Sequence, residues 1–148
     1  PNLALRAKAG MCAICPARNV PKCDVQQVES ILGAAGATVI LKEKAFDAVT
    51  ALSGSGPAYF AYMEAAMAEG GVKLGLTPKV ARLLAEQTMY GTAKFLRESG
   101  ADLQAFINGV CTKGGTTAAG MTKIANPMFK KIVAETLAAA AKRSQELA

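Results

Sequence analysis

Hydrophobic residues along this chain follow two different spacings, and the change falls near Lys44. Short apolar runs at 11–15 and 38–41 are typical of buried strands. Between them, apolar residues recur at helical spacing, and Asp24 is expected to cap this helix, which ends at about Ala35. Strand, helix and strand in this order are the rhythm of an α/β domain, but two short strands alone would leave their edges unpaired.

After this change the hydrophobic spacing is helical to the end of the chain. A short helix over 46–52 is predicted to stop at the Ser-Gly-Ser-Gly run of 53–56, and Pro57 is predicted to begin a new helix that ends at about 70–74. Further helices are predicted from Pro78 to about 98, from the capping Asp102 to about 108, behind the glycines at 114–115, and from Pro127 into the charged C-terminal residues. The chain is therefore predicted to be mainly α.

The core of such a helical part would be thin. Of 148 residues, 51% are hydrophobic, but only 5% are aromatic and none is Trp, so the packing must rest on Ala, Leu, Val, Ile and Met. About 100 residues of this kind bury too little apolar surface for a stable lone domain. We therefore expect an obligate homodimer with interleaved helices.

The net charge of +6 fits an acidic small substrate or a phosphorylated cofactor. Basic residues are spread along the chain and aromatic stacking platforms are few, which argues against nucleic acid as a partner. No apolar run reaches the roughly 18 residues of a membrane span, and nothing resembles a signal peptide. We expect no nucleic-acid or membrane partner and a cytoplasmic location.

The sequence contains no histidine, which removes the commonest general base, the histidine-activated nucleophiles and the mixed Cys/His zinc sites. Cys12 and Cys15 form a C-x-x-C that could be a redox pair or half of a zinc site, but no second C-x-x-C completes it. Together with Cys23 and Cys111 they are best interpreted as ordinary buried thiols. No metal is expected, and no catalytic acid or base can be assigned.

The most informative stretch is Val-Cys-Thr-Lys-Gly-Gly-Thr-Thr-Ala-Ala-Gly at 110–120. Adjacent glycines let successive N–H groups point the same way, and a helix start just behind them adds unpaired donors and a favourable dipole. Thr112, Thr116 and Thr117 can supply hydroxyl donors. These features predict a seat for a carboxylate or phosphate; the competing interpretation is a tight turn with a threonine N-cap and no ligand.

Two separated stretches resemble one family. The segment Asp-Ala-Val-Thr-Ala-Leu-Ser-Gly-Ser-Gly-Pro-Ala-Tyr at 47–59, followed by Gly-Val-Lys-Leu-Gly-Leu at 71–76, looks like the start of the C-terminal domain of pyrroline-5-carboxylate reductases. The 110–120 stretch resembles the signature loop of the same family. The similarity runs from about Pro1 to the C-terminus.

The resemblance implies a fold and an activity. Members of this family reduce 1-pyrroline-5-carboxylate to L-proline with NADPH or NADH, in the last step of proline biosynthesis. They join an N-terminal Rossmann domain to an all-helical dimerisation domain, and their dimers often assemble further, commonly to decamers. Residues 1–43 would then be the C-terminal remnant of a dinucleotide-binding domain, and residues 44–148 a helical dimerisation and substrate-binding domain.

The resemblance also implies roles for individual residues. The substrate carboxylate would sit on backbone N–H groups and hydroxyls of the signature loop, namely at Thr112, Gly114, Gly115, Thr116 and Thr117. Ser55 and Thr50 would face the ring nitrogen or the nicotinamide, with helix capping as an equally open role. Asn2 matches a Pro-Asn-Thr-Pro segment near the nicotinamide and is the candidate cofactor contact.

The chain also departs from the family pattern. No G-x-G-x-x-G follows a strand, Leu3 and Ala4 replace the Thr and Pro behind Asn2, and Lys113 replaces the usual Pro of the loop. We therefore expect the chain not to turn over substrate by itself. The alternatives are a non-catalytic helical oligomerisation module, the helical domain of a reductase resembling 6-phosphogluconate dehydrogenase and, more distantly, a basic nucleic-acid binder.

Overall fold

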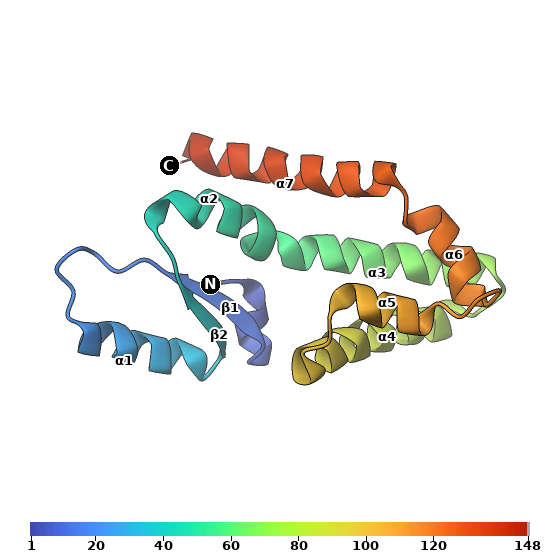
Figure 1. Ribbon diagram of the computed structural model, residues 1–148, viewed down its shortest axis with the longest axis horizontal. Helices are drawn as coiled ribbons and strands as arrows, with labels where there is room; N and C mark the ends of the chain where they lie inside the picture. Colours follow the sequence, from blue (N-terminus) through green and yellow to red (C-terminus); the bar gives the residue numbers. More distant parts are fainter. Residues whose placement is uncertain (148) are drawn as a thin grey trace. The chain divides into compact units, whose positions relative to one another are not determined.

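A computed structural model describes residues 1–147, which form two compact units (Figure 1). The first unit consists of Pro1–Phe60 and the residues from Val133 onward, and the second is Ala61–Ile132. Helices make up most of both units, as the hydrophobic spacing predicts. The strands are confined to the first unit, where a short strand–helix–strand motif precedes the helices, so the predicted fold class is confirmed.

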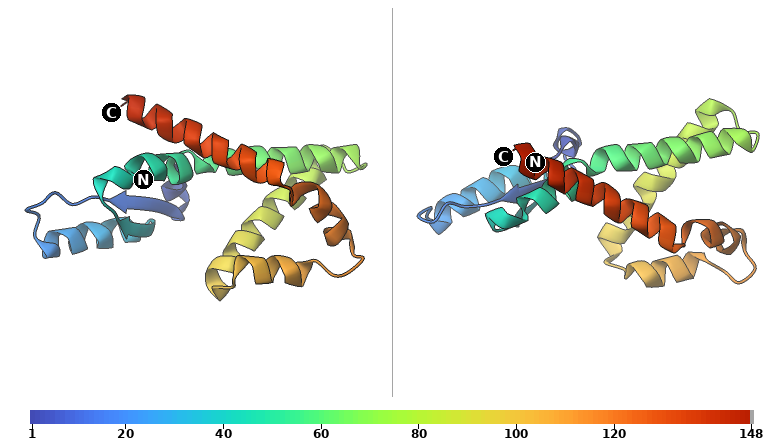
Figure 2. Two further views of the ribbon diagram at one scale, coloured as in Figure 1. Left: turned by 45° about the horizontal axis from the view of Figure 1, so that its top comes forward. Right: turned by 90° about the horizontal axis from the view of Figure 1, so that it is seen from above.

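In the first unit, β1 (Gly10–Ile14) and β2 (Gly36–Ile40) form a two-stranded parallel sheet, with α1 (Lys22–Gly33) as the connection between them (Figures 1 and 2). The register pairs the first and last residues of one strand with those of the other, from Gly10 opposite Gly36 to Ile14 opposite Ile40. A parallel pair needs such a crossover because its strands run the same way. Cys12, in the middle of β1, is only 1% exposed.

The glycines that open the two strands allow an unusually close approach. A Cβ on Gly10 would lie 2.6 Å from the side chain of Leu5, and a Cβ on Gly36 would overlap the backbone of Gly10. Leu5 belongs to a 3₁₀-helix, Leu3–Ala7, in a stretch with no clear hydrophobic period. The chain therefore folds back onto the start of β1 because these glycines leave room for it.

The predicted cap of α1 is wrong. The helix begins at Lys22 behind Pro21, three residues earlier than expected, and Asp24 lies in its first turn instead of at its N-cap. Pro21 pre-sets a backbone angle suited to a helix start, and an acidic side chain in the first turn still complements the helix dipole. The second strand likewise begins at Gly36, earlier than the β-branched run alone indicates.

The chain does not leave its helical path at the Ser-Gly-Ser-Gly run, where a break was predicted. A 3₁₀ turn, Glu43–Ala45, leads into α2 (Phe46–Val49), which widens into a π-helical turn, Thr50–Gly54, and then continues as α3 (Gly56–Lys73). The N–H of Ser55 bonds the carbonyl of Thr50, five residues back, at 2.8 Å. Because Pro57 has no N–H and clashes with a regular preceding turn, the helix accommodates it by widening.

The second unit contains most of α3, the helices α4 (Pro78–Ser99), α5 (Leu103–Val110) and α6 (Thr116–Ile124), and the beginning of the last helix. The predicted cap of α5 is confirmed, because Asp102 Oδ1 accepts the N–H of Ala105 at 2.9 Å. At the start of α4, Thr77 Oγ1 accepts the N–H of Val80 at 3.4 Å. Gly100 ends α4 in the left-handed conformation, at φ 62°. Asn126 caps α7 (Pro127–Leu147) by accepting the N–H of Phe129 at 2.9 Å.

Small residues dominate the packing, as expected. Among the described residues, the hydrophobic side chains that are fully buried are Cys12, Ala51, Ala81 and Ala85. In the second unit, Gly71 of α3 lies so close to Ala81 of α4 that a Cβ would be 3.2 Å from the alanine methyl group. Many larger apolar side chains stay exposed, among them Leu83 at 62%. Within residues 1–147, every helix is too short or too polar to span a bilayer.

Candidate functional site

The signature stretch folds as a tight turn that delivers the chain into α6. Helix α5 ends at Val110, the N–H of Gly115 donates to the carbonyl of Thr112 at 2.9 Å, and α6 begins at Thr116 with Gly115 as its N-cap. Gly114 adopts φ 74°, a left-handed conformation that a side chain would strain. The predicted glycine turn ahead of a helix is therefore present.

Gly115 is also packed against Thr112. A Cβ on Gly115 would lie 3.1 Å from the carbonyl oxygen of Thr112 and would overlap its Oγ1. The hydroxyl of Thr112 thus lies directly beside Gly115, the N-cap residue of α6. Any residue larger than glycine at 115 would displace this hydroxyl.

The start of α6 has no side-chain cap. Its N-cap is Gly115, which has no side chain, so the competing interpretation of a threonine N-cap is not what the structure contains. The first N–H groups of a helix lack intrahelical partners, and here they belong to Thr116, Thr117 and Ala118. Lys113, exposed in the turn, adds a positive charge nearby. Uncapped donors, hydroxyls and a cation together favour an anion.

Thr50 and Ser55 stand at the two ends of the π turn and are brought together by the bond between their main chains. Ser55 is half-buried and Thr50 is exposed. No side chain caps this turn, and within residues 1–147 neither hydroxyl has a hydrogen-bond partner, so the structure shows no capping role for them. Both hydroxyls are therefore free to bind a ligand.

The side chain of Asn2 makes hydrogen bonds to Ser53 and to Met11. Its Nδ2 donates to the carbonyl oxygen of Ser53 at 3.2 Å and approaches the Ser53 hydroxyl at 3.4 Å. Its Oδ1 accepts the N–H of Met11 at 3.1 Å. Sequence reasoning did not single out Ser53; the available signal was Pro57, four residues later, which cannot donate to that carbonyl.

The sequence-predicted site residues fall into two groups. Asn2, Thr50 and Ser55 lie together in the first unit, whereas the seat formed by 112–117 lies in the second. Each group is compact by itself.

The cysteines carry free thiols, but the expectation that all four are buried is wrong: Cys23 is exposed, and Cys15 and Cys111 are half-buried. Cys12 is buried in β1, and the pKa of Cys15 is raised by burial and by the neighbouring Glu43 carboxylate, which accepts a hydrogen bond from the thiol and repels the thiolate. A raised pKa makes a cysteine a poor nucleophile. Among the described residues, His, Cys, Asp and Glu do not gather into a group that could hold a metal ion.

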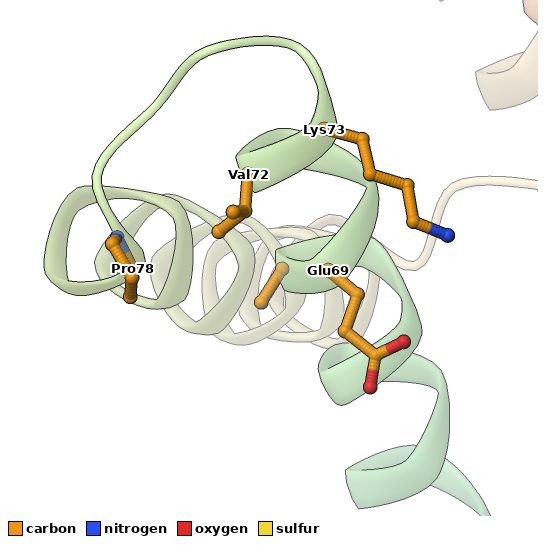
Figure 3. A pocket seen from close by; sticks show the side chains of 5 residues that line it. Glu69, Val72, Lys73 and Pro78 are labelled. Carbon is orange, nitrogen blue, oxygen red and sulfur yellow. The ribbon is translucent and has the colours of Figure 1, made fainter.

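A shallow hollow in the second unit lies between the end of α3 and the start of α4 (Figure 3). It measures about 340 Å³ and is lined by Ala68, Glu69, Val72, Lys73 and Pro78. In Figure 3, the charged ends of Glu69 and Lys73 lead away from the apolar side chains of Val72 and Pro78. Its open, apolar lining includes no predicted site residue, so we do not assign the chemistry to it.

Comparison with known proteins places the chain in a family. Residues 43–147 match the family model for pyrroline-5-carboxylate reductase dimerisation. The pyrroline-5-carboxylate reductase of Synechocystis sp. is 40% identical over 147 residues, which are 99% of this chain and 55% of that protein. The reductase of Arabidopsis thaliana is 42% identical over 120 residues, 81% of this chain and 44% of that protein. The chain thus spans about half the length of these relatives.

Solved structures give the same result. The pyrroline-5-carboxylate reductase of Coxiella burnetii superimposes with a TM-score of 0.97 at 32% identity, covering 100% of this chain and 55% of that one. The pyrroline carboxylate reductase of Plasmodium falciparum, solved with NADP bound, superimposes with a TM-score of 0.88 at 30% identity, covering 99% and 60%. The chain belongs to the pyrroline-5-carboxylate reductase family, and residues 43–147 are the part that matches its dimerisation domain.

Proposed function

We propose that the protein to which these residues belong reduces 1-pyrroline-5-carboxylate to L-proline, with NADPH or NADH as the hydride donor. The observation that carries this proposal is the uncapped start of α6 behind the Gly114–Gly115 turn, in a chain of this family. A cyclic imino acid presents one carboxylate, and this turn offers backbone donors and hydroxyls suited to one anion.

In the proposed mechanism the chain binds and orients the substrate. The carboxylate sits on Thr112, Gly114, Gly115, Thr116 and Thr117. A protonated imine is already electrophilic, so no histidine is needed, and the Ser55 and Thr50 hydroxyls face the ring nitrogen or the nicotinamide. The cofactor supplies the hydride.

The residues of this chain could contact the nicotinamide end of the cofactor, but they include no motif for its pyrophosphate. Asn2 and Ser55, which lie in one unit, would stand near the nicotinamide, whereas the sequence contains no G-x-G-x-x-G for the pyrophosphate. We therefore propose that residues 1–43 belong to a dinucleotide-binding domain and residues 44–148 to the dimerisation and substrate-binding domain.

We also propose that a second copy of the chain covers the exposed apolar side chains of the helical region. Few hydrophobic side chains among residues 1–147 are fully buried, and Leu83, Leu84 and Phe95 of α4 are each more than half exposed. A folded domain normally buries such side chains. The proposed enzyme is a cytoplasmic homodimer, with decamers as its larger assembly.

The test is a chimaera in which this whole chain follows the dinucleotide-binding segment of the Synechocystis relative. NADPH oxidation in the presence of 1-pyrroline-5-carboxylate, with L-proline identified as the product, supports the proposal. A folded chimaera that binds NADPH but does not reduce the imine contradicts it. The control is the same chimaera carrying Gly109→Ala, a change in α5 where the added Cβ meets open space. This variant should keep the activity of the parent chimaera.

A further inference from the structure

Asn2 joins two parts of the first unit that are far apart in sequence. Its main-chain N–H donates to the carbonyl of Met11 at 3.1 Å, and its Oδ1 accepts the N–H of Met11 at the same distance. This pair of bonds fixes the Asn2 side chain beside the beginning of β1. Its remaining polar group, the Nδ2 amide, points to Ser53, 51 residues later.

The carbonyl of Ser53 is an acceptor that the helix itself cannot satisfy. In a regular α-helix this oxygen would receive the N–H of residue 57, but Pro57 has none. The amide of Asn2 takes that place at 3.2 Å. A half-buried carbonyl without a donor would be costly, so this bond holds the π turn in one position.

Asparagine suits this position because it combines a donor and an acceptor on one planar group. The donor serves Ser53 and the acceptor serves Met11, so neither aspartate nor an apolar side chain can make both bonds at neutral pH. The donating amide is thereby engaged within the protein. Its simplest effect on a ligand is indirect, through the π turn that carries Thr50 and Ser55.

We propose that Asn2 is a positioning residue, whose amide fixes the π turn to the start of β1 and so sets the orientation of the Ser55 hydroxyl toward the reacting substrate. This role rests on the reductase activity proposed above. In this role Asn2 acts through the carbonyl of Ser53. Loss of the amide donor therefore impairs the chemical step more than it impairs binding of the imine, whose carboxylate seat lies on residues 112–117.

The test uses Asn2→Asp in the active chimaera, with Asn19→Asp, the same charge change in an exposed turn, as its matched control. At pH 8 we expect kcat to fall about 100-fold, the loss that a misplacement of about 1 Å can cause, with KM for the imine changed less than about threefold. Lowering the pH toward 5 should restore kcat about tenfold relative to the parent. A protonated carboxyl regains an O–H for Ser53 while its other oxygen still accepts from Met11.

A merely structural role would not give this pH-dependent recovery. A parallel pH profile for Asn2→Asp, Asn19→Asp and the parent overturns the proposal. A pH-independent loss of kcat accompanied by a raised KM for NADPH also overturns it, because that result indicates direct cofactor contact.

If Asn2→Asp does not fold at pH 8, the measurement is repeated with Pro57→Ala added, because that change gives the Ser53 carbonyl a main-chain donor. The kcat loss should then persist, and full recovery would contradict the proposal. An inactive parent chimaera refutes the reductase function itself, before any variant is compared.

Discussion

Ser55 donates its main-chain N–H to the carbonyl of Thr50 at 2.8 Å, five residues back along the chain. This bond defines the π turn between α2 and α3 and brings two hydroxyl residues together. π-Helical turns are rare and occur frequently at functional sites.

Ser55→Ala is expected to lower kcat of the chimaera by about 10- to 100-fold, with little change in KM, because the hydroxyl has no partner within the described protein and is proposed to orient the substrate. The melting temperature should be nearly unchanged, since no hydrogen bond is lost. Steady-state kinetics and thermal unfolding measure the two effects. A stability loss with unchanged kcat would instead assign Ser55 a purely structural role.

Thr117→Val is expected to raise KM for the imine substrate far more than KM for the nicotinamide. The change keeps the side-chain shape but removes a donor from the carboxylate seat, a loss of about 2 kcal/mol or roughly 30-fold. Thr122→Val, later in α6 where the hydroxyl donates to Ala119, is the control. Equal effects on both Michaelis constants, or no effect, would argue against a carboxylate seat at the start of α6.

The two glycines of α6 and its turn should respond oppositely to alanine. Gly114→Ala is expected to destabilise the chain by about 1–2 kcal/mol, because alanine must adopt φ 74°. Gly120→Ala, inside α6 where a Cβ meets open space, should stabilise it by about 0.5–1 kcal/mol. Urea denaturation of the full chain measures both. A neutral Gly114→Ala would mean that the turn relaxes to another conformation.

Cys15 is expected to react with iodoacetamide more slowly than the exposed Cys23 at pH 8. Burial and the Glu43 carboxylate raise the pKa of the Cys15 thiol, so less thiolate is present at a given pH. The pKa of Cys15 is higher in the folded chain than in the unfolded chain. Any stability that the neutral thiol contributes is therefore fully present below the pKa of a free thiol and is lost as the pH rises through the raised pKa. Glu43→Gln should lower the pKa of Cys15 and speed its alkylation, while Cys23 keeps its rate. Mass spectrometry of modified peptides distinguishes the two sites.

Sedimentation of the chain at micromolar concentration is expected to show a dimer. Leu83→Glu should shift it to monomer, because a charge would replace an apolar side chain that is 62% exposed in one copy. Leu83→Met, which keeps the apolar character, should remain dimeric. A compact, stably folded monomer of the unmodified chain would rule out the proposed dimer.

The sequence alone determined the mainly helical character, the positions of most helices and the glycine turn ahead of α6. These features depend on interactions within a few residues, such as the caps at Thr77 and Asp102 and the Pro at the start of a helix. Local signals of this kind can be read directly from spacing. The threonine cap weighed for α6 was wrong, because Gly115 takes that place and leaves the donors free.

Only the tertiary structure decided what happens around Pro57 and Asn2. The run at 53–56 predicts a break, but the helix widens and continues, and the orphaned carbonyl of Ser53 finds the amide of Asn2. No periodic pattern connects residues 51 apart, because that bond depends on how the N-terminal segment folds back onto β1. The sequence therefore shows where a donor is missing, whereas the fold determines which residue supplies it.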